Sequence, residues 1–262
     1  MRLLLVKLSS LGDVIHTLPA LTDAHTAVPG LEVTWVVEEA YQQMPCWHPA
    51  VTQVIPVALR RWRKTPLRAW RAGAWTQLRQ QLRAQPYDLI LDAQGLLKSA
   101  WVASQARGPR AGLDRHSARE PLASLLYQHR YPVAWGLHAV LRLRQLLAQA
   151  LSYTLPATAP DFSLHCPPDP RWLGPQPYLV FLHATAWSSK QWPEVAWHAL
   201  LALAQAAQFR VLLPWGNEIE RRRAEVLAAG GNATVLPRLS LDELAGLLAG
   251  AAGVVGVDTG LM

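Results

Sequence analysis

The most restrictive feature of this sequence is an apolar run near its amino end that stops at a small polar turn. Residues 3–6 read Leu-Leu-Leu-Val, as in a fully buried parallel strand, and apolar residues return at helical spacing from Val14. The turn between them holds serines and Gly12, which can cap a helix or let a ligand approach the backbone. Asp13 would then lie at the carboxyl end of the first strand, where open α/β sheets bind ligands. We therefore take Asp13 as a candidate catalytic group, with helix capping as the alternative.

The same order of strand, turn and helix recurs along the chain and predicts an α/β protein with parallel sheets. Further strands are expected at 31–38, 51–57, 87–92, 178–182, 210–213, 234–236 and 253–257. Helices are expected at 40–44, 66–84, 137–150, 193–205, 218–229 and 241–249, and residues 112–121 read as a charged loop.

Seven prolines between residues 155 and 177 divide the chain, because neither a helix interior nor a central strand accepts proline. We expect a first domain over residues 1–155, a linker over 156–177 and a second domain over 178–262. The chain ends soon after the last expected strand, without the helix that should follow it. A second domain truncated at its carboxyl end is therefore expected.

The composition indicates a folded protein with an acidic partner. Hydrophobic residues make up 51% of the chain and charged residues 16%, which excludes a disordered protein. A net charge of +7 favours nucleic acid, anionic lipid or phosphorylated small molecules as partners. Two distant cysteines without metal-ligand spacing indicate a reducing compartment. Neither a signal peptide nor an apolar run of membrane-spanning length is recognised, so we expect a cytoplasmic protein.

Three turns in the second domain follow predicted strands and carry groups suited to a nucleotide diphosphate. They are residues 183–193 with Thr185 and Lys190, residues 213–220 with Glu220, and residues 258–260. Because the carboxyl ends of parallel strands meet at one sheet edge, these groups should gather there. For each turn the alternative is a capping role with a solvent-exposed side chain. The Gly-rich motifs of dinucleotide enzymes and P-loop ATPases, and an Asp-x-Asp pair for a metal, do not occur.

The positive charge is concentrated in a first group at residues 60–64, which continues through Arg68 and Arg71, and in a second group at residues 221–223. The first group is interleaved with Trp62, Trp70 and Trp75, a pattern found in peripheral proteins at a lipid surface, although a solvated face is the alternative. Residues 92–99 repeat the strand, turn and helix pattern of the amino end. In that repeat Lys98 could face an anion, and in the charged loop Arg119 could bind one or pair with Glu120.

Several of these motifs together carry a resemblance to a known family. Residues 7–21, 35–39, 60–64, 92–99, 118–124, 185–193 and 257–260 closely resemble the lipopolysaccharide heptosyltransferase I family of glycosyltransferase family 9. The resemblance implies a GT-B glycosyltransferase, with two Rossmann-like domains that face each other across a cleft, the acceptor mainly on the first and the donor mainly on the second. Such enzymes transfer L-glycero-D-manno-heptose from ADP-heptose to the inner Kdo of Kdo2-lipid A, with inversion and without a metal or other cofactor.

The resemblance also assigns roles to residues of this chain. Asp13 would be the general base that deprotonates the acceptor hydroxyl. The donor would meet Thr185, Ala186, Lys190, Glu220, Leu239, Asp258, Thr259 and Gly260. The acceptor would meet Ser10, Gly12, Arg60, Arg61, Arg63, Lys64, Lys98 and Arg119, with Lys7 as a weaker candidate. Ala186 departs from the family, which often has a second threonine there, so one hydroxyl contact to phosphate would be lost.

The expected partners are ADP-heptose, Kdo2-lipid A and the anionic inner leaflet of the inner membrane, on which a monomer would act as a peripheral protein. One alternative is a related heptosyltransferase with a heptose acceptor, which the basic segment 60–64, suited to Kdo carboxylates and lipid phosphates, disfavours. A basic nucleic-acid-binding protein is the alternative from another class. It is disfavoured because the basic residues lack a recognised nucleic-acid motif and the buried α/β pattern suits small ligands better, so we expect no nucleic-acid partner.

Overall fold

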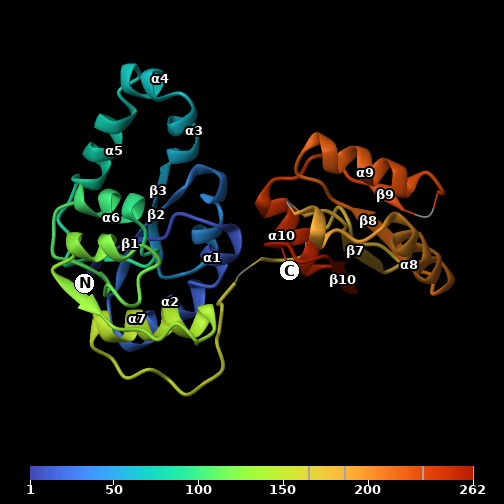
Figure 1. Cartoon of the computed structure of the whole chain (residues 1–262). Helices are drawn as coiled ribbons and strands as arrows, with labels where there is room; N and C mark the ends of the chain where they lie inside the picture. Colours follow the sequence, from blue (N-terminus) through green and yellow to red (C-terminus); the bar gives the residue numbers. More distant parts are fainter. Residues whose placement is uncertain (165, 186, 232, 262) are drawn as a thin grey trace. The chain divides into compact units, whose positions relative to one another are not determined.

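The structure, a computed structural model, describes residues 1–164, 166–185, 187–231 and 233–261. The chain divides into two compact units, Met1–Leu164 and His165–Met262, and each contains one parallel sheet with helices (Figure 1). The division falls inside the proline-rich segment. Of the described helices, none has the length and apolar character needed to cross a membrane.

The sheet of the first unit has six parallel strands in the order β3-β2-β1-β4-β5-β6. These strands are β1 (Arg2–Val6), β2 (Glu32–Glu38), β3 (Val51–Val57), β4 (Leu89–Asp92), β5 (Arg110–Leu113) and β6 (His129–Tyr131). The chain builds outward from β1 through β2 to β3 and then returns to β4 on the other side of β1. The strand order therefore reverses between β1 and β4, which is where doubly wound sheets bind ligands.

Helices pack on the first sheet because its central strands are apolar on both faces. Leu4 and Val6 of β1 pack with Leu78 of α5 (Ala74–Leu82) and Val102 of α6 (Leu97–Ser104) in one buried cluster. Helices α2 (Leu18–Ala27) and α7 (Ala139–Leu151) pack side by side (Figure 1).

A buried ion pair joins α2 to α7. The Nε atom of Arg144 donates to Oδ2 of Asp23 over 2.6 Å, and the Arg144 guanidinium also donates to the carbonyls of Pro156 and Thr158. The start of the proline-rich segment is therefore held on the first unit. Its later part is held on the second unit, where the Asp169 amide donates to the Gly246 carbonyl.

The basic region after β3 differs from the sequence prediction. In place of one helix over 66–84, the structure has α3 (Leu59–Lys64), α4 (Pro66–Arg71) and α5. Gly73 separates α4 from α5 because its φ of 66° is left-handed. The helix predicted over 40–44 is also wrong, since two short 3₁₀ turns, Glu39–Tyr41 and Met44–Trp47, lie there.

Two short strands of the first unit are missing from the sequence prediction. Strand β5 overlaps the start of the predicted charged loop 112–121, and β6 follows after a 3₁₀ turn, η3 (Pro121–Leu126). Both strands lie at the β6 edge of the sheet and carry arginine, so they lack the continuous apolar run of a buried strand.

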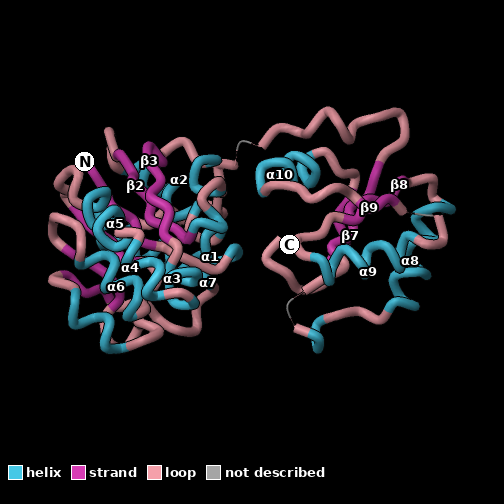
Figure 2. Tube along the Cα trace, turned by 90° about the horizontal axis from the view of Figure 1, so that it is seen from above, coloured by secondary structure: helices cyan, strands magenta, loops and turns pink. Residues whose placement is uncertain are grey.

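The sheet of the second unit has four parallel strands in the order β10-β7-β8-β9. They are β7 (Tyr178–Leu182), β8 (Arg210–Leu213), β9 (Thr234–Val235) and β10 (Gly253–Gly256), close to the predicted bounds. Alternate residues of β7 face opposite sides. Phe181 packs with α8 (Glu194–Ala206) and α9 (Glu218–Ala228), and Val180 packs with α10 (Leu241–Ala249) (Figure 2). The strand order of the second sheet reverses between β7 and β10.

Candidate active site

The candidate site of the first unit is built at the reversal between β1 and β4, from the turn that follows each strand. Lys7 leaves the end of β1, and its Nζ atom donates to the carbonyl of Ala93 beyond β4 over 3.1 Å. The Lys7 side chain is buried. Burial lowers the pKa of Lys7, while the negative charges of Asp13 and Asp92 oppose that shift.

Asp13 lies in the first turn of the short helix α1 (Leu11–Ile15). Its Oδ2 atom accepts hydrogen bonds from the Ser10 amide over 2.7 Å and the Ser10 hydroxyl over 2.9 Å. Its Oδ1 atom lies 3.8 Å from Nζ of Lys7, and 41% of the side chain is exposed. A Cβ atom placed on Gly12 would meet nothing within 4 Å. One carboxylate oxygen therefore caps the turn, and part of the side chain remains exposed to solvent.

Gln94 holds the turn that carries Asp13, a role that the sequence prediction did not assign. Its Oε1 atom accepts from the amides of Leu8 and Ser9 over 2.9 and 3.2 Å, and its Nε2 atom donates to the Ser9 carbonyl over 2.6 Å. These bonds join the two turns of the site. The sequence could have indicated this role, because Gln94 lies in the turn that follows a predicted strand.

Asp92, at the end of β4, is fully buried beneath this turn. It accepts hydrogen bonds from the Gln94 amide over 2.8 Å, the Ser99 hydroxyl over 2.8 Å and the Tyr127 hydroxyl over 2.6 Å. Burial raises the pKa of Asp92, and these donors oppose the shift because they stabilise the carboxylate. Tyr127 carries no local sequence signal, because it reaches Asp92 only through the fold.

The Tyr127 ring lies against the backbone of Gly112 in β5. A Cβ atom at Gly112 would come within 2.4 Å of the ring. Glycine at this position therefore leaves the space that the tyrosine occupies on its way to Asp92.

The predicted acceptor cations fall into two groups. Arg60 and Arg61, on α3, are held at the carboxyl end of β2: Nη1 of Arg60 donates to the Tyr41 hydroxyl over 3.2 Å, and Nη2 of Arg61 donates to Glu39 over 2.9 Å. The next two cations on α3, Arg63 and Lys64, are exposed.

Lys98 and Arg119 belong to the β4 side of the unit. Lys98 is exposed on α6, and Arg119 lies close enough to Lys7 for its charge to lower the lysine pKa. The alternative pairing of Arg119 with Glu120 is not among the salt bridges of the described residues, and the Glu120 carboxylate instead accepts from the Leu97 amide over 2.6 Å.

A further cation, Arg142 of α7, was missed by the sequence prediction. Its charge also lowers the pKa of Lys7. The guanidinium stacks on Trp135 at 4.3 Å from the ring centroid and donates to the Ser117 carbonyl over 2.8 Å. Its sequence position inside a helix gives no signal of this placement. The first site thus places Asp13 beside Lys7, with the charges of Arg119 and Arg142 near enough to act on that lysine, and such a cluster is suited to an anionic ligand.

The candidate site of the second unit is built at the reversal between β7 and β10. Thr185 follows β7 and donates from its hydroxyl to the Asp258 carbonyl over 3.0 Å. Nζ of Lys190 donates to the Asp258 carboxylate, so three of the predicted donor residues lie together. The Gln191 side chain joins this turn by donating to the Thr185 carbonyl over 3.3 Å.

The remaining predicted donor residues that the structure describes lie along the same sheet edge. Glu220 accepts from the Gly216 amide and the Asn217 side chain, both over 2.7 Å, at the start of α9. Leu239 packs against the core beside α10. Thr259 and Gly260 follow Asp258 directly, and Ala186 lies outside the described residues.

His183 directly follows β7 and precedes Thr185 by two residues. Its ring is fully buried. Burial and the nearby charge of Arg223 lower the pKa of His183 to about 4, with a smaller opposing effect from the Pro214 carbonyl. The imidazole is therefore neutral at physiological pH. Arg223 also holds the turn above, because it donates to the Gln191 side chain over 2.9 Å.

Comparison with known proteins identifies the family. Residues 75–262 match the glycosyltransferase family 9 (heptosyltransferase) pattern. The chain belongs to glycosyltransferase family 9. Over its whole length this glycosyltransferase is 57% identical to lipopolysaccharide heptosyltransferase 1 of Pseudomonas aeruginosa, covering 74% of that protein. It is 48% identical to lipopolysaccharide heptosyltransferase 1 of Salmonella typhimurium, covering 83% of that protein.

Solved structures agree with this assignment. The Escherichia coli heptosyltransferase WaaC with ADP matches the whole chain with a TM-score of 0.94 at 48% identity, and 82% of that protein is covered. WaaC with ADP-2-deoxy-2-fluoro heptose matches with a TM-score of 0.90 at 48% identity and 84% coverage. The predicted GT-B fold and the resemblance to the heptosyltransferase I family are confirmed.

Proposed function

We propose that this family 9 glycosyltransferase transfers L-glycero-D-manno-heptose from ADP-heptose to Kdo of Kdo2-lipid A in synthesis of the lipopolysaccharide inner core. The observation that carries the proposal is the 57% identity to a lipopolysaccharide heptosyltransferase 1 across the entire chain. The donor is supported by the similarity to WaaC, which was solved with ADP and with a fluorinated ADP-heptose.

The first unit supplies the base in this proposal. Asp13 accepts the proton of the acceptor hydroxyl, whose oxygen then forms a bond to the anomeric carbon of heptose. The bond from that carbon to the diphosphate breaks at the same time, and ADP leaves on the opposite face, so the configuration inverts. The exposed part of the Asp13 carboxylate and the hydrogen bonds that orient it support this role.

The second unit binds the donor and stabilises the leaving group. The ammonium of Lys190 and the hydroxyl of Thr185 contact the diphosphate, and Glu220 accepts hydrogen bonds from the ribose. Leu239, Asp258, Thr259, Gly260 and Ala186 complete the donor contacts. The Lys190 cation stabilises the negative charge that develops on the diphosphate, so the reaction needs no metal. The meeting of Thr185, Lys190 and Asp258 at the strand reversal supports this assignment.

The acceptor is held by cations because Kdo carries a carboxylate and lipid A carries phosphates. The residues assigned to it are Ser10, Gly12, Arg60, Arg61, Arg63, Lys64, Lys98 and Arg119. Guanidinium groups can bind carboxylate and phosphate through two parallel hydrogen bonds, which fixes orientation as well as charge. We further propose that the enzyme acts as a monomer on the cytoplasmic face of the inner membrane, bound peripherally to anionic lipid.

The experiment that tests this function measures heptose transfer from ADP-heptose to Kdo2-lipid A. The P. aeruginosa relative serves as the positive control, and calorimetric titration with ADP reports donor binding separately. Asp13→Asn keeps the shape and the Ser10 hydrogen bonds but cannot take a proton, so transfer should fall about 10²- to 10⁴-fold while ADP binding is retained. Asp161→Asn, at an exposed carboxyl of the proline-rich segment, is the matched control.

Two results would revise the proposal. Equal transfer by Asp13→Asn and the parent chain would remove Asp13 as the base. The second result is that the chain binds ADP-heptose and transfers heptose to an acceptor that ends in heptose, but not to Kdo2-lipid A. In that case the proposed Kdo acceptor would be wrong, and a heptose acceptor would take its place.

A further inference from the structure

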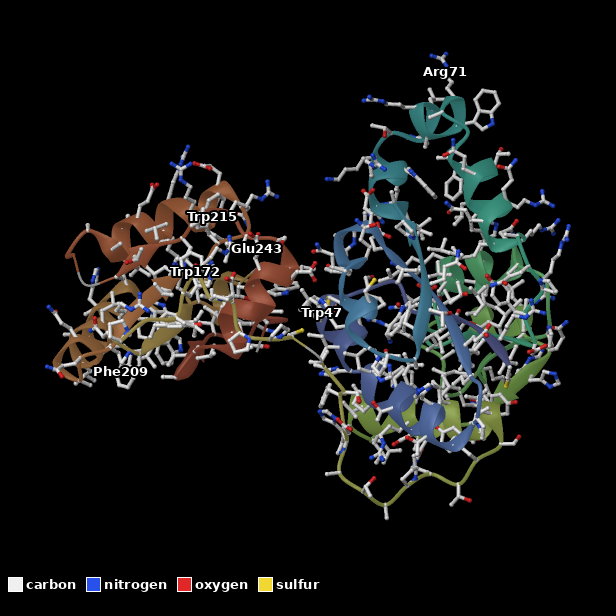
Figure 3. All side chains as sticks on the ribbon, turned by 180° about the vertical axis from the view of Figure 1, so that it is seen from behind. Trp47, Arg71, Trp172, Phe209, Trp215 and Glu243 are labelled. Atoms are coloured by element: carbon white, nitrogen blue, oxygen red, sulfur yellow. The ribbon has the colours of Figure 1, made fainter. Side chains whose placement is uncertain are left out.

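The segment between Glu39 and Asp88 contains no acidic residue. It contains eight cations: Arg60, Arg61, Arg63, Lys64, Arg68, Arg71, Arg79 and Arg83. Most of them lie on α3, α4 and α5, which extend away from the body of the first unit with α4 farthest out (Figure 1). Arg71, at the end of α4, lies at the tip of this excursion (Figure 3).

The α4 tip exposes two large apolar side chains. Leu67 is 73% exposed and Trp70 is 72% exposed, and their spacing of three residues places them on one helix face. Isolated exposed apolar residues are common on soluble proteins, but two neighbours at the end of a protruding helix form a surface with no covering group among the described residues.

The other tryptophans of the segment form its base. Trp62 and Trp75 meet edge to face with ring centroids 4.5 Å apart, and Trp75 meets Trp101 of α6 edge to face at 5.1 Å. Two of the three tryptophans that the sequence suggested for a lipid surface, Trp62 and Trp75, are therefore half-buried against other rings of the first unit. These contacts join α3 and α5 to α6 and support the tip from below, leaving Trp70 as the exposed member of the three.

The cations of the segment also divide into a group near the base and a group at the tip. Arg60 and Arg61, near the base, are held by Tyr41 and Glu39. Arg68 and Arg71 flank the apolar pair on α4, and no acidic side chain of the described chain lies within salt-bridge distance of them. Long basic side chains beside exposed tryptophan and leucine are suited to a surface whose outer layer is anionic and whose inner layer is apolar.

We propose that the α4 tip is a membrane anchor: Leu67 and Trp70 enter the headgroup region of an anionic bilayer, and Arg68 and Arg71 bind phospholipid phosphates. This deepens the peripheral membrane association proposed above by assigning it to one element. A bilayer fits better than a protein partner because the charge has one sign throughout the segment while the apolar pair is small. Arg63 and Lys64, between base and tip, remain assigned to the acceptor.

The first test is co-sedimentation of the full chain with vesicles. One set contains phosphatidylglycerol and phosphatidylcholine, and the other contains phosphatidylcholine alone; inorganic phosphate is added to a third sample as a competitor. The double variant Leu67→Ser/Trp70→Ser should bind the anionic vesicles about tenfold less tightly than the parent chain, and Arg68→Gln/Arg71→Gln should also weaken binding. Millimolar phosphate should not release the parent chain, because it supplies no apolar layer.

The matched control is Val195→Ser/Leu203→Ser, which removes two similarly exposed apolar side chains, 75% and 67% exposed, from α8 of the second unit. This variant should bind vesicles as the parent chain does. Unchanged vesicle binding by the tip variant would overturn the proposal. The proposal would also be overturned if, in sedimentation velocity without lipid, the parent chain were a dimer and the tip variant a monomer. The tip would then bind a second copy of the chain.

A second measurement separates this inference from the proposed function. Transfer is compared on Kdo2-lipid A embedded in vesicles and on a deacylated, water-soluble Kdo acceptor. The tip variant should lose rate on the embedded acceptor and retain it on the soluble one; equal loss on both would overturn the anchor. If the parent chain binds anionic vesicles through the tip yet transfers to neither acceptor, the proposed function fails and the anchor stands.

Discussion

The Nζ atom of Lys7 lies 3.8 Å from Oδ1 of Asp13, and the same nitrogen donates to the carbonyl of Ala93. One buried cation therefore connects the turn after β1 with the turn after β4. Because the hydrogen bond to Ala93 holds the Lys7 ammonium in place, the Asp13 carboxylate has a basic neighbour at a fixed position.

Gln94 should act as a positioning residue for Asp13. Gln94→Ala removes three hydrogen bonds to residues 8 and 9, so we expect kcat to fall about 10- to 100-fold, because small displacements of a reacting group are costly. KM for ADP-heptose should change little. Gln105→Ala, which affects only contacts at the end of α6, is the control. A change in KM alone would contradict the assignment.

Tyr127 should stabilise the first unit through Asp92. Tyr127→Phe leaves the buried carboxylate without its 2.6 Å donor, and we expect a loss of about 1–3 kcal/mol in the free energy of unfolding. Urea denaturation measures it. Tyr153→Phe removes a hydroxyl with a long, 3.5 Å contact to the Ala20 carbonyl and should cost less. Equal losses for the two variants would argue against the network.

The ion pair of Asp23 and Arg144 should tolerate joint replacement better than loss of one partner. Both side chains are buried, so Arg144→Met strands a carboxylate and should cost about 3–5 kcal/mol of stability. Asp23→Leu combined with Arg144→Met should recover part of that loss. The exposed pair of Arg171 and Glu243 provides the comparison, with an expected effect below about 1 kcal/mol. Thermal unfolding of Arg144→Met, the double variant and Glu243→Gln measures these differences.

His183 should make the second unit acid-sensitive. The folded pKa of His183 is about 4, below the ordinary value of 6.5, so the unfolded chain binds a proton first as the pH falls. The contribution of His183 to the free energy of unfolding is therefore fully present above pH 6.5. It is lost progressively between pH 6.5 and 4, by up to about 3 kcal/mol.

The variant His183→Gln tests this dependence. Its thermal unfolding should be flatter across pH 6.5–4 than that of the parent chain, whatever its stability at neutral pH. His198→Gln, at an exposed position on α8, should keep the parent slope. An unchanged slope in His183→Gln would show that other groups cause the acid sensitivity.

Lys190 should contribute mainly to donor affinity. Lys190→Ala removes a cation from the reversal between β7 and β10, and we expect ADP to bind about 10- to 100-fold more weakly, the usual effect of a charge-assisted hydrogen bond. Arg222→Ala, an exposed cation of α9, is the control for net charge. Calorimetric titration gives both dissociation constants, and equal values would exclude contact with the diphosphate.

Much of the fold could be predicted because its central strands are continuous apolar runs. The strand over 178–182 and the helix over 241–249 were predicted with the bounds that the structure shows. Strands β5 and β6 escaped prediction because they are short and carry charged residues. The break at Gly73 was missed because helical periodicity does not reveal a left-handed residue between two helices.

The sequence indicated the site only where the chemistry follows a strand. Asp13, Lys190 and Asp258 were found in this way, because the carboxyl ends of parallel strands meet at one edge. Arg142 and Tyr127 were not, since helix packing and a distant loop bring them in. The roles assigned to the donor and acceptor residues came from the family resemblance and remain predictions.

The close contact between Gly112 and the Tyr127 ring has an evolutionary consequence. A methyl group at position 112 and a full-size ring at position 127 exclude each other, so neither position can change freely while the other is retained. Across related sequences the two positions should covary, with a side chain at 112 accompanied by a smaller residue at 127. Lineages that make this exchange would also lose a donor to Asp92 and would need to replace it from another loop.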